Sequence, residues 1–241
     1  MNTPASPTPP ASSAPVRLLI VDDDPLVRAG LTLMLGGDQG IEIVGEGADG
    51  VEAEELVERL RPDVVLMDIR MPVMDGLTAT ERLRRRPDAP EVVVLTTFHA
   101  DEQVLRAIRA GAAGFVLKDT PPARIVDSVR RVAAGDPVLS PAVTRQLMAR
   151  AAGGGRDDRA DRARRRFGQL AEREQEVAVA VGRGGSNAEI AASLYLSVAT
   201  VKTHVSRILA KLELNNRVQI ALLVHDAGLL DTDDGGGSHL G

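Results

Sequence analysis

Residues 64–76 read VVLMDIRMPVMDG. The stretch begins with an unbroken apolar run, 64–67, and an aspartate, Asp68, follows it. A short run of this kind, rich in valine and leucine and without polar alternation, is typical of a β-strand buried on both faces of a parallel sheet. Asp68 therefore stands at the carboxyl end of a predicted buried strand. In open α/β sheets this is the end at which functional groups gather.

Similar apolar runs lie on both sides of this stretch, and helical patterns separate them. The predicted strands are 16–21, 41–44, 64–67, 92–95 and 115–117. The predicted helices are 25–35, 50–61, 77–85, 102–110 and 123–134. Five consecutive strand–helix units predict a five-stranded parallel sheet with helices on both faces, of the flavodoxin-like α/β class.

The composition excludes several classes of site and protein. The chain contains no cysteine, which excludes disulfides, thiolate metal sites and cysteine nucleophiles. One tyrosine, three phenylalanines and no tryptophan are too few for a platform on which single-stranded nucleic acid stacks. The sequence has neither an apolar run of about 18 residues nor a signal peptide. We therefore expect a cytoplasmic protein without a membrane partner.

Polar side chains stand directly after four of the five predicted strands. They are Asp22 and Asp23 after the first strand, Asp68 after the third, Thr96 after the fourth and Lys118 after the fifth. Taken one at a time, such residues are more often helix caps, turn formers or surface charges, and we expect Asp24 and Asp49 to be caps. Because parallel strands end at one edge, we expect the five groups to converge.

Three carboxylates at one edge repel one another by about 4 kcal/mol per pair, for a separation of ~4 Å and an effective dielectric near 20. A divalent cation removes this repulsion, and oxygen ligands without His or Cys favour Mg²⁺. Lys118 supplies a charge for a phosphoryl oxygen, and Thr96 supplies a hydroxyl donor. These groups together are suited to forming and holding an aspartyl phosphate.

Four separated motifs carry a resemblance that covers residues 16–135. They are VDDDP at 21–25, MDIRMPVMDG at 67–76, LTTF at 95–98 and AGAAGFVLK at 110–118. In this order they resemble the receiver domain of response regulators. The resemblance implies that Asp68 accepts a phosphoryl group from a sensor histidine kinase.

The same resemblance implies roles for the neighbours of Asp68. Mg²⁺ would be held by Asp22, Asp23, Asp68 and the backbone carbonyl of Arg70. Thr96 would move toward the phosphate while the ring of Phe115 turns inward. Many receivers have tyrosine at this last position, so a hydroxyl is missing here.

The lifetime of the phosphate can also be predicted. Arg70 and Phe98 each stand two residues after a pocket residue, at the predicted rim. Both side chains are bulky enough to hinder an attacking water, so we expect slow self-dephosphorylation.

From Leu170 to about Leu230 only helical patterns occur. A first helix is interrupted at Gly184-Gly185, a second covers 188–194, and Ser197 is expected to cap a third over 198–212. Short helices joined by turns with Gly and Ser predict a small all-α helix-turn-helix domain.

The third of these helices has two unlike faces. At 100° per residue, one arc is apolar and is expected to face the core; it carries Val198, Val201, Val205, Ile208, Leu209 and Leu212. The other face is small, polar and cationic, and consists mainly of Lys202, Thr203, Ser206 and Arg207. An ordinary surface helix usually mixes acids and bases, so this face favours contact with double-stranded DNA.

A second resemblance supports this prediction. Segments 189–191, 196–205 and 208–212, with Arg217, resemble the LuxR-type helix-turn-helix, and the tandem arrangement resembles the NarL/FixJ class of response regulators. The resemblance implies that Lys202, Thr203 and Ser206 face the major groove. It places Thr200, Arg207 and Lys211 near phosphates.

The net charge of the C-terminal part bears on how tightly it can bind DNA. Residues 170–241 hold six basic and nine acidic side chains, so the affinity of this part for DNA should be modest. A homodimer formed on phosphorylation would supply a second recognition helix and so raise the affinity for a two-part site.

The sequence also predicts the domain boundaries. We expect a disordered tail over 1–15, the receiver over 16–135, a linker with an extra helix near its start over 136–168, the helix-turn-helix over 169–230 and a second tail over 231–241.

Two other functions would each account for only part of the sequence. An Mg²⁺-dependent phosphatase or phosphotransferase would share the acidic pocket, but it would leave 169–230 without a role. A DNA-binding protein that needs no phosphorylation would leave the complete acidic set without a role.

Overall fold

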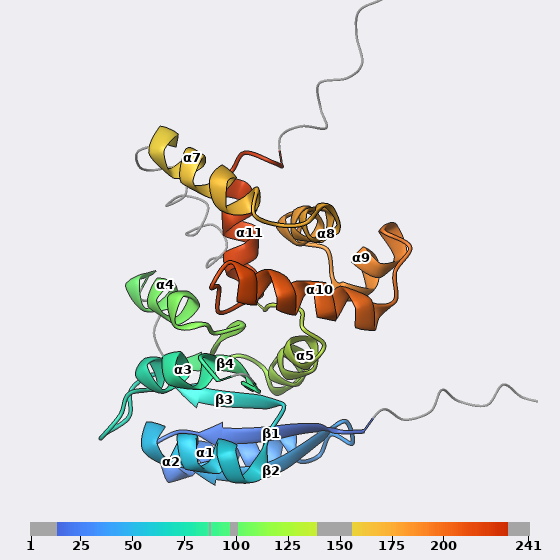
Figure 1. Cartoon of the computed structure of the whole chain (residues 1–241). Coiled ribbons are helices and arrows are strands. Elements are labelled where there is room, and N and C mark those ends of the chain that lie inside the picture. The colour runs from blue at the N-terminus through green and yellow to red at the C-terminus, as the bar shows by residue number, and fades with distance from the viewer. Residues whose placement is uncertain (1–13, 87, 97–100, 139–155, 231–241) are drawn as a thin grey trace, which may run out of the picture.

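The computed structural model describes residues 14–86, 88–96, 101–138 and 156–230 of the chain (Figure 1). Its first half contains five parallel strands in the order β2-β1-β3-β4-β5. The strands are β1 Val16–Val21, β2 Ile41–Gly47, β3 Val64–Asp68, β4 Glu91–Thr96 and β5 Gly114–Leu117. The helices that follow them are α1 Pro25–Leu35, α2 Gly50–Leu60, α3 Gly76–Arg84, α4 Asp101–Ala110 and α5 Pro122–Ala133. The predicted five-stranded parallel sheet is confirmed.

The sheet is buried on both faces, as the unbroken apolar runs predict. In β3, Val65 and Met67 belong to a core shared with α2, α3 and α4. Val64 and Leu66 point the other way, into a core shared with α1 and α5. Side chains that alternate between two cores explain why the strand has no polar position before Asp68.

Three aspartates begin helices on the carboxyl side of the sheet. Asp24 caps α1 by accepting a hydrogen bond from Leu26 N, and Asp49 caps α2 by accepting from the backbone of the first turn. Both are the helix caps that the sequence predicts. Asp75 does the same for α3, so the acidic residues near this edge divide into caps and pocket residues.

The C-terminal domain is entirely helical. Its helices are α7 Arg156–Phe167, α8 Glu172–Gly182, α9 Asn187–Ser193, α10 Val198–Lys211 and α11 Arg217–Asp226. Val201 and Ile208 of α10, with Leu212 directly after its end, are buried in the core of the domain, as the apolar arc predicts. Val198 is an exception: it is 44% exposed, because it stands at the first position of the helix, beyond the core.

The arginine-rich stretch over Arg156–Phe167, which falls within the expected linker of 136–168, is helix α7. Its Ala163 is buried in the C-terminal core. Arg164 Nε donates to Ala227 O over 3.1 Å, and Arg166 donates to Leu212 O. Both carbonyls stand at helix carboxyl ends, where intrahelical partners are lacking. The extra helix expected around 141–152 lies outside the described residues, as do the two tails from 1–13 and 231–241.

The two halves of the protein are in contact. The C-terminal domain lies against the end of the sheet that carries α4 and α5, with α10 facing α5 (Figure 1). Contacts between α11 and α4 join the domains directly. In the part of the chain that the structure describes, no helix is both long and apolar enough to cross a membrane.

Candidate functional site

The predicted acidic groups meet at the carboxyl edge of the sheet. Asp22, Asp23 and Asp68 each offer a carboxylate oxygen, and these atoms all lie within 4.8 Å of one another. Strand register explains the approach, because Val21 pairs with Met67 and the next residues along the two strands are Asp22 and Asp68. Asp22 and Asp68 are buried, whereas Asp23 is exposed at the rim.

Lys118 lies between the two buried carboxylates. Its Nζ is 2.6 Å from Asp22 Oδ2 and 3.2 Å from Asp68 Oδ1. Burial raises the pKa of Asp68 above its ordinary value, an effect that the charge of Lys118 opposes. Burial also acts to lower the pKa of Lys118, but the contacts with Asp22 and Asp68 outweigh it and raise that pKa. Lys118 therefore stays charged at the place where the two acids are closest.

Backbone donors orient the same carboxylates. Asp68 Oδ2 accepts a hydrogen bond from Arg70 N over 3.1 Å, and Asp22 Oδ1 accepts from Asp24 N over 3.0 Å. With each carboxylate held on one side by backbone and on the other by Lys118, the oxygens have defined positions. An edge of three oxygen ligands without nitrogen or sulfur suits a hard divalent cation.

The other residues predicted for the pocket differ in how far they are buried. Thr96 ends β4 and is 3% exposed. The ring of Phe115 is 4% exposed, so it already lies inside the apolar core. Arg70 is exposed beside the pocket, in a depression that also involves Gln103 and Arg106. Phe98 is not among the described residues.

Gly76 is a pocket residue that the sequence did not single out. A Cβ atom at this position would lie 1.8 Å from the carbonyl oxygen of Asp68. Its own N–H donates to Ile69 O over 2.9 Å, which closes the loop after β3. Only glycine allows α3 to begin this close to the strand that ends at Asp68. The sequence signal was the Asp75-Gly76 pair, which is also an ordinary turn signal.

The residues predicted to contact DNA lie on α10 in two settings. Some bond within their own domain or are exposed, and two face the receiver. Thr203 Oγ1 bonds back to Ala199 O, Thr200 Oγ1 bonds to the cap Ser197, and Lys211 Nζ pairs with Glu174 Oε2 at 3.1 Å. Arg207 is exposed. Lys202 and Ser206 instead line a cavity of about 190 Å³ between the two domains.

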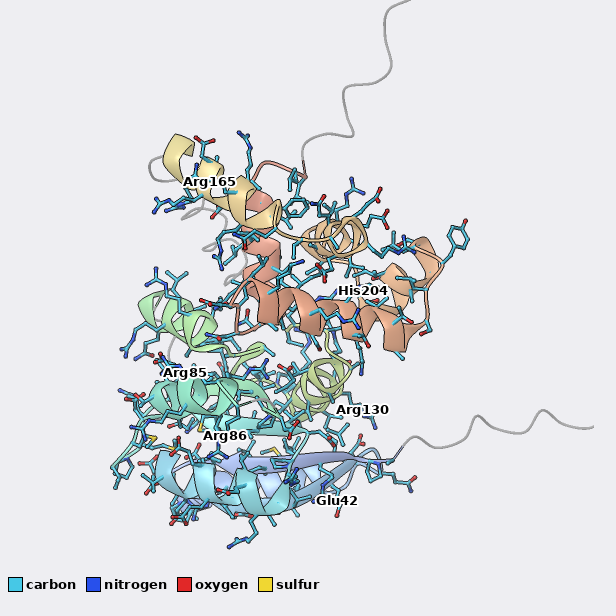
Figure 2. The ribbon with its side chains drawn as sticks, in the orientation of Figure 1. Glu42, Arg85, Arg86, Arg130, Arg165 and His204 are labelled. Atoms are coloured by element: carbon cyan, nitrogen blue, oxygen red, sulfur yellow. The ribbon has the colours of Figure 1, made fainter. Side chains whose placement is uncertain are left out.

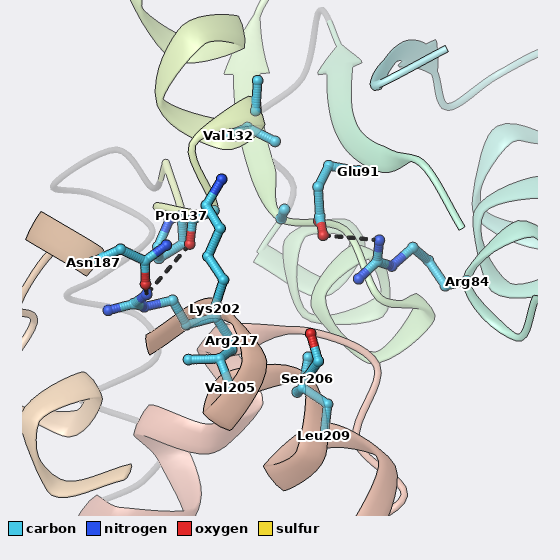
Figure 3. A pocket seen from close by; sticks show the side chains of 13 residues that line it. Arg84, Glu91, Val132, Pro137, Asn187, Lys202, Val205, Ser206, Leu209 and Arg217 are labelled. Atoms are coloured by element: carbon cyan, nitrogen blue, oxygen red, sulfur yellow. Dashed lines mark hydrogen bonds and ion pairs between the residues drawn. The ribbon is translucent and has the colours of Figure 1, made fainter. Parts of the chain in front are cut away.

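At this cavity, called the interdomain cavity below, part of the α10 face that the sequence predicts to contact DNA lies opposite the receiver. Lys202 and Ser206 point from α10 toward the receiver, with Val205 and Leu209 beside them (Figure 3). The opposite wall includes Val132 and residues after the end of α5. His204 lies on another side of α10, toward α8 (Figure 2), where it contributes to lowering the pKa of Glu174.

Arg217 closes one end of the interdomain cavity. It is 7% exposed and donates to Asn187 Oδ1 and Gly185 O, while its Nη1 lies 3.8 Å from Asp136 Oδ1. Burial lowers the pKa of Arg217 from its ordinary value, which the charge of Asp136 opposes. The carbonyl of Gly185 is thus held by an arginine from α11.

Comparison with known proteins agrees with both halves. The family described as "Response regulator receiver domain" matches residues 18–130, and "Bacterial regulatory proteins, luxR family" matches residues 168–224. The transcriptional regulatory protein LiaR of Bacillus subtilis is 36% identical over 87% of this chain and 97% of its own length. The response regulator protein VraR of Staphylococcus aureus is 36% identical over 89% of this chain and 99% of its own.

A solved structure gives the same result for the fold. A two-component response regulator of the LuxR family from Aurantimonas sp. SI85-9A1 is 31% identical, with a TM-score of 0.54 over 58% of this chain and 100% of that chain. The acidic edge, the helix-turn-helix and these relatives lead to one conclusion. The chain belongs to the NarL/FixJ class of two-component response regulators, transcription regulators rather than enzymes, in which a receiver domain is joined to a LuxR-type DNA-binding domain.

Proposed function

We propose that Asp68 is phosphorylated by a sensor histidine kinase, and that this phosphorylation controls the binding of α10 to specific double-stranded DNA. The observation that carries the proposal is the meeting of Asp22, Asp23, Asp68 and Lys118 at one edge of the sheet. Each residue alone has an ordinary structural explanation, but the convergence of three acids, two of them paired with one lysine, does not.

The chain's own groups suit the transfer step. A carboxylate oxygen of Asp68 attacks phosphorus, a P–O bond forms, and the P–N bond to the kinase imidazole breaks, which leaves the electron pair on that nitrogen. Lys118 Nζ, already 3.2 Å from Asp68 Oδ1, stabilises the charge on the phosphoryl oxygens. Thr96, at the end of the neighbouring strand, supplies a hydroxyl donor.

The acidic edge fits Mg²⁺. Asp22, Asp23 and Asp68, with the backbone carbonyl of Arg70, would hold the ion by oxygen atoms alone. When bound, Mg²⁺ neutralises the acids and draws charge from the phosphoryl group. The charge of Lys118 then remains available to the phosphoryl oxygens.

The interdomain cavity explains why phosphorylation would matter. Lys202 and Ser206 are exposed to water, but the receiver stands opposite them across a cavity of about 190 Å³, which is too small for a DNA duplex. In this arrangement the receiver would keep α10 out of a major groove. Phosphorylation would act as a population shift toward a form in which the domains separate. The chain would work in the cytoplasm, where the kinase and DNA are both accessible.

The separated form would dimerise. Along α1, Leu26, Leu33 and Met34 recur at helical spacing and are exposed, at 81%, 83% and 45%. Gly30 lies on the same side, so a second helix could approach closely. A second copy of the chain, related by a twofold axis, would cover this apolar stripe and bring two α10 helices to one site.

The experiment is a selection of DNA fragments by the full chain, with and without acetyl phosphate and Mg²⁺, for wild type and Asp68→Asn. We expect enrichment of a two-part site only for the phosphorylated wild type. The same enrichment without phosphorylation, and with Asp68→Asn, would favour the phosphorylation-independent alternative. Multiple turnover of a phosphorylated metabolite would favour the enzymatic one.

Sedimentation tests the dimer separately. Leu33→Asp should keep the phosphorylated chain monomeric while Asp68 is still phosphorylated. Glu58→Gln, a change at an exposed residue of α2, should leave the dimer intact. A phosphorylated Leu33→Asp dimer would contradict the proposed interface.

A further inference from the structure

The domains meet where two receiver helices end. Asn216 Nδ2 donates to Ile108 O over 2.9 Å and to Ala112 O over 2.8 Å, at the carboxyl end of α4. Asn187 Nδ2 donates to Ala134 O over 2.8 Å, just beyond α5. Carbonyls at helix ends have few intrahelical partners, and here they take side-chain donors from the DNA-binding domain. Ile108 O also accepts from Gly111 N over 3.1 Å within the receiver.

Asn216 has a second task within its own domain. Its Oδ1 accepts a hydrogen bond from Gln219 N over 2.9 Å, which makes it the N-cap of α11. One amide thus caps the start of α11 with its oxygen and the end of α4 with its nitrogen. The side chain is 1% exposed, and both of its N–H groups have acceptors. Among the side chains of this size only an amide can do both.

Gln219 repeats the same division one turn later. Its Oε1 accepts from Asn215 N over 2.8 Å within the C-terminal domain. Its Nε2 donates to Ile108 O over 3.0 Å and lies 3.4 Å from Arg109 O, across the interface. The amide oxygens of Asn216 and Gln219 therefore hold the C-terminal domain together, and their nitrogens attach it to α4.

The position of α4 connects this contact to the phosphorylation pocket. In the chain, α4 lies between Thr96 and Phe115, the two residues expected to respond to phosphate. In space, Val218 of α11 belongs to the same apolar core as Phe115, Ile108 and Ala112. A shift of the carboxyl end of α4 would therefore change the hydrogen bonds of Asn216 and the packing of Val218 together.

We infer that Asn216 is the positioning residue that docks the DNA-binding domain on α4, so that loss of its two donated hydrogen bonds frees α10 without phosphorylation. The effect on DNA rests on the proposed function, whereas the docking itself does not. No DNA group is needed for the contact, and its partners are backbone carbonyls of the receiver.

The isosteric change Asn216→Asp separates the two tasks. Aspartate keeps the oxygen that caps α11 and suits a helix N-terminus. It replaces the donating nitrogen by an acceptor that faces two carbonyl oxygens at hydrogen-bond distance, in a buried place. The matched control is Gln175→Glu, which makes the same amide-to-acid change on α8, where the amide nitrogen donates to Leu170 O over 3.1 Å within the C-terminal domain and not across the interface.

Small-angle scattering of the unphosphorylated full chain at pH 8 measures docking, and amide hydrogen exchange of α8–α10 checks that the domain stays folded. We expect Asn216→Asp to increase the radius of gyration and Gln175→Glu to leave it unchanged. DNA affinity without phosphorylation should rise on the order of tenfold for Asn216→Asp, since two hydrogen bonds that favour the closed form are lost.

The outcomes are distinguishable. An expanded Asn216→Asp chain whose DNA affinity is unchanged would support the docking role and count against the proposed masking of α10. A chain as compact as wild type would overturn the inference. If exchange shows that Asn216→Asp unfolds the C-terminal domain, Gln219→Glu decides, because it keeps the bond from Asn215 N and loses the donors to α4. Expansion of that variant supports docking through these amides, and a compact chain overturns it.

Discussion

Glu174 of α8 and Lys211 of α10 form an ion pair, with Oε2 and Nζ 3.1 Å apart. The same carboxylate oxygen accepts a hydrogen bond from Ala171 N over 2.9 Å at the start of α8. One residue thus joins the first helix of the helix-turn-helix to the end of the recognition helix. Lys211, which the family resemblance assigns to a DNA phosphate, is held on the C-terminal domain by this pair.

The stability of this domain should depend on pH through Glu174. The backbone N–H of Ala171, with help from Lys211, holds the pKa of Glu174 below its ordinary value of 4.5. The folded state therefore prefers the ionised form. Its stabilising contribution is complete above about pH 4.5 and is lost as the pH falls through the lower pKa of the folded protein.

Glu174→Gln tests this dependence. We expect the free energy of unfolding at pH 7 to fall by about 1 kcal/mol, since a charge-assisted hydrogen bond is lost, and its decline below pH 4.5 to become shallower. Chemical denaturation at several pH values measures both. Glu176→Gln is the control, because Glu176 pairs only with the neighbouring Arg173 at the surface. Equal pH profiles for wild type and Glu174→Gln would contradict the prediction.

Gly76→Ala should damage the pocket. The new Cβ would overlap the carbonyl oxygen of Asp68, so either β3 or the start of α3 must move, at a cost of about 1–3 kcal/mol. We expect a lower melting temperature and slower phosphorylation by acetyl phosphate. Gly37→Ala is a suitable control, because no heavy atom lies within 4 Å of a Cβ built there. A Gly76→Ala protein that is as stable and reactive as wild type would show that the loop after β3 adapts freely.

Helix α7 should be part of the folded C-terminal domain. Arg164 and Arg166 donate to carbonyls at the ends of α11 and α10. Ala163 is buried in the apolar core of the C-terminal domain. Replacing both arginines by methionine should lower the stability of this domain by about 1–3 kcal/mol, since two hydrogen bonds from charged groups are removed. Amide hydrogen exchange of α10 and α11 in the full chain gives the measurement. Arg165→Met changes an exposed neighbour (Figure 2) and should have no effect.

The lifetime of the phosphate should depend on Arg70. Its side chain is exposed beside Asp68, and its backbone N–H donates to the Asp68 carboxylate. Arg70→Ala keeps that backbone bond and opens the rim to water, so phosphorylated Asp68 should lose phosphate several-fold faster. Arg85→Ala, at the far end of α3, controls for loss of a surface charge. If the double variant Arg70→Ala, Phe98→Ala holds phosphate as long as wild type, the rim does not protect it.

The acidic pocket was predictable because it follows from local patterns. Apolar runs define the strands, parallel strands end at one edge, and Asp22, Asp68 and Lys118 stand one residue beyond those runs. The helix-turn-helix was predictable for a similar reason, since its caps and apolar arc lie within a few turns of each other. Helix α7 was harder to predict, because a helix with nine charged residues over Arg156–Phe167 has almost no apolar period to recognise.

The docking of the two domains lay beyond the sequence pattern. Asn216 and Gln219 are ordinary polar residues in sequence, and their partners are backbone carbonyls more than 100 residues away. A carbonyl carries no side-chain signature, so nothing in the residue types marks Ile108 or Ala112 as acceptors. By itself the sequence determined the sheet, the acidic groups that meet around Asp68 and the polar face of α10. Only the tertiary structure decided that Lys202 and Ser206 face the receiver, because their orientation depends on where the acceptor carbonyls at the end of α4 stand relative to α11.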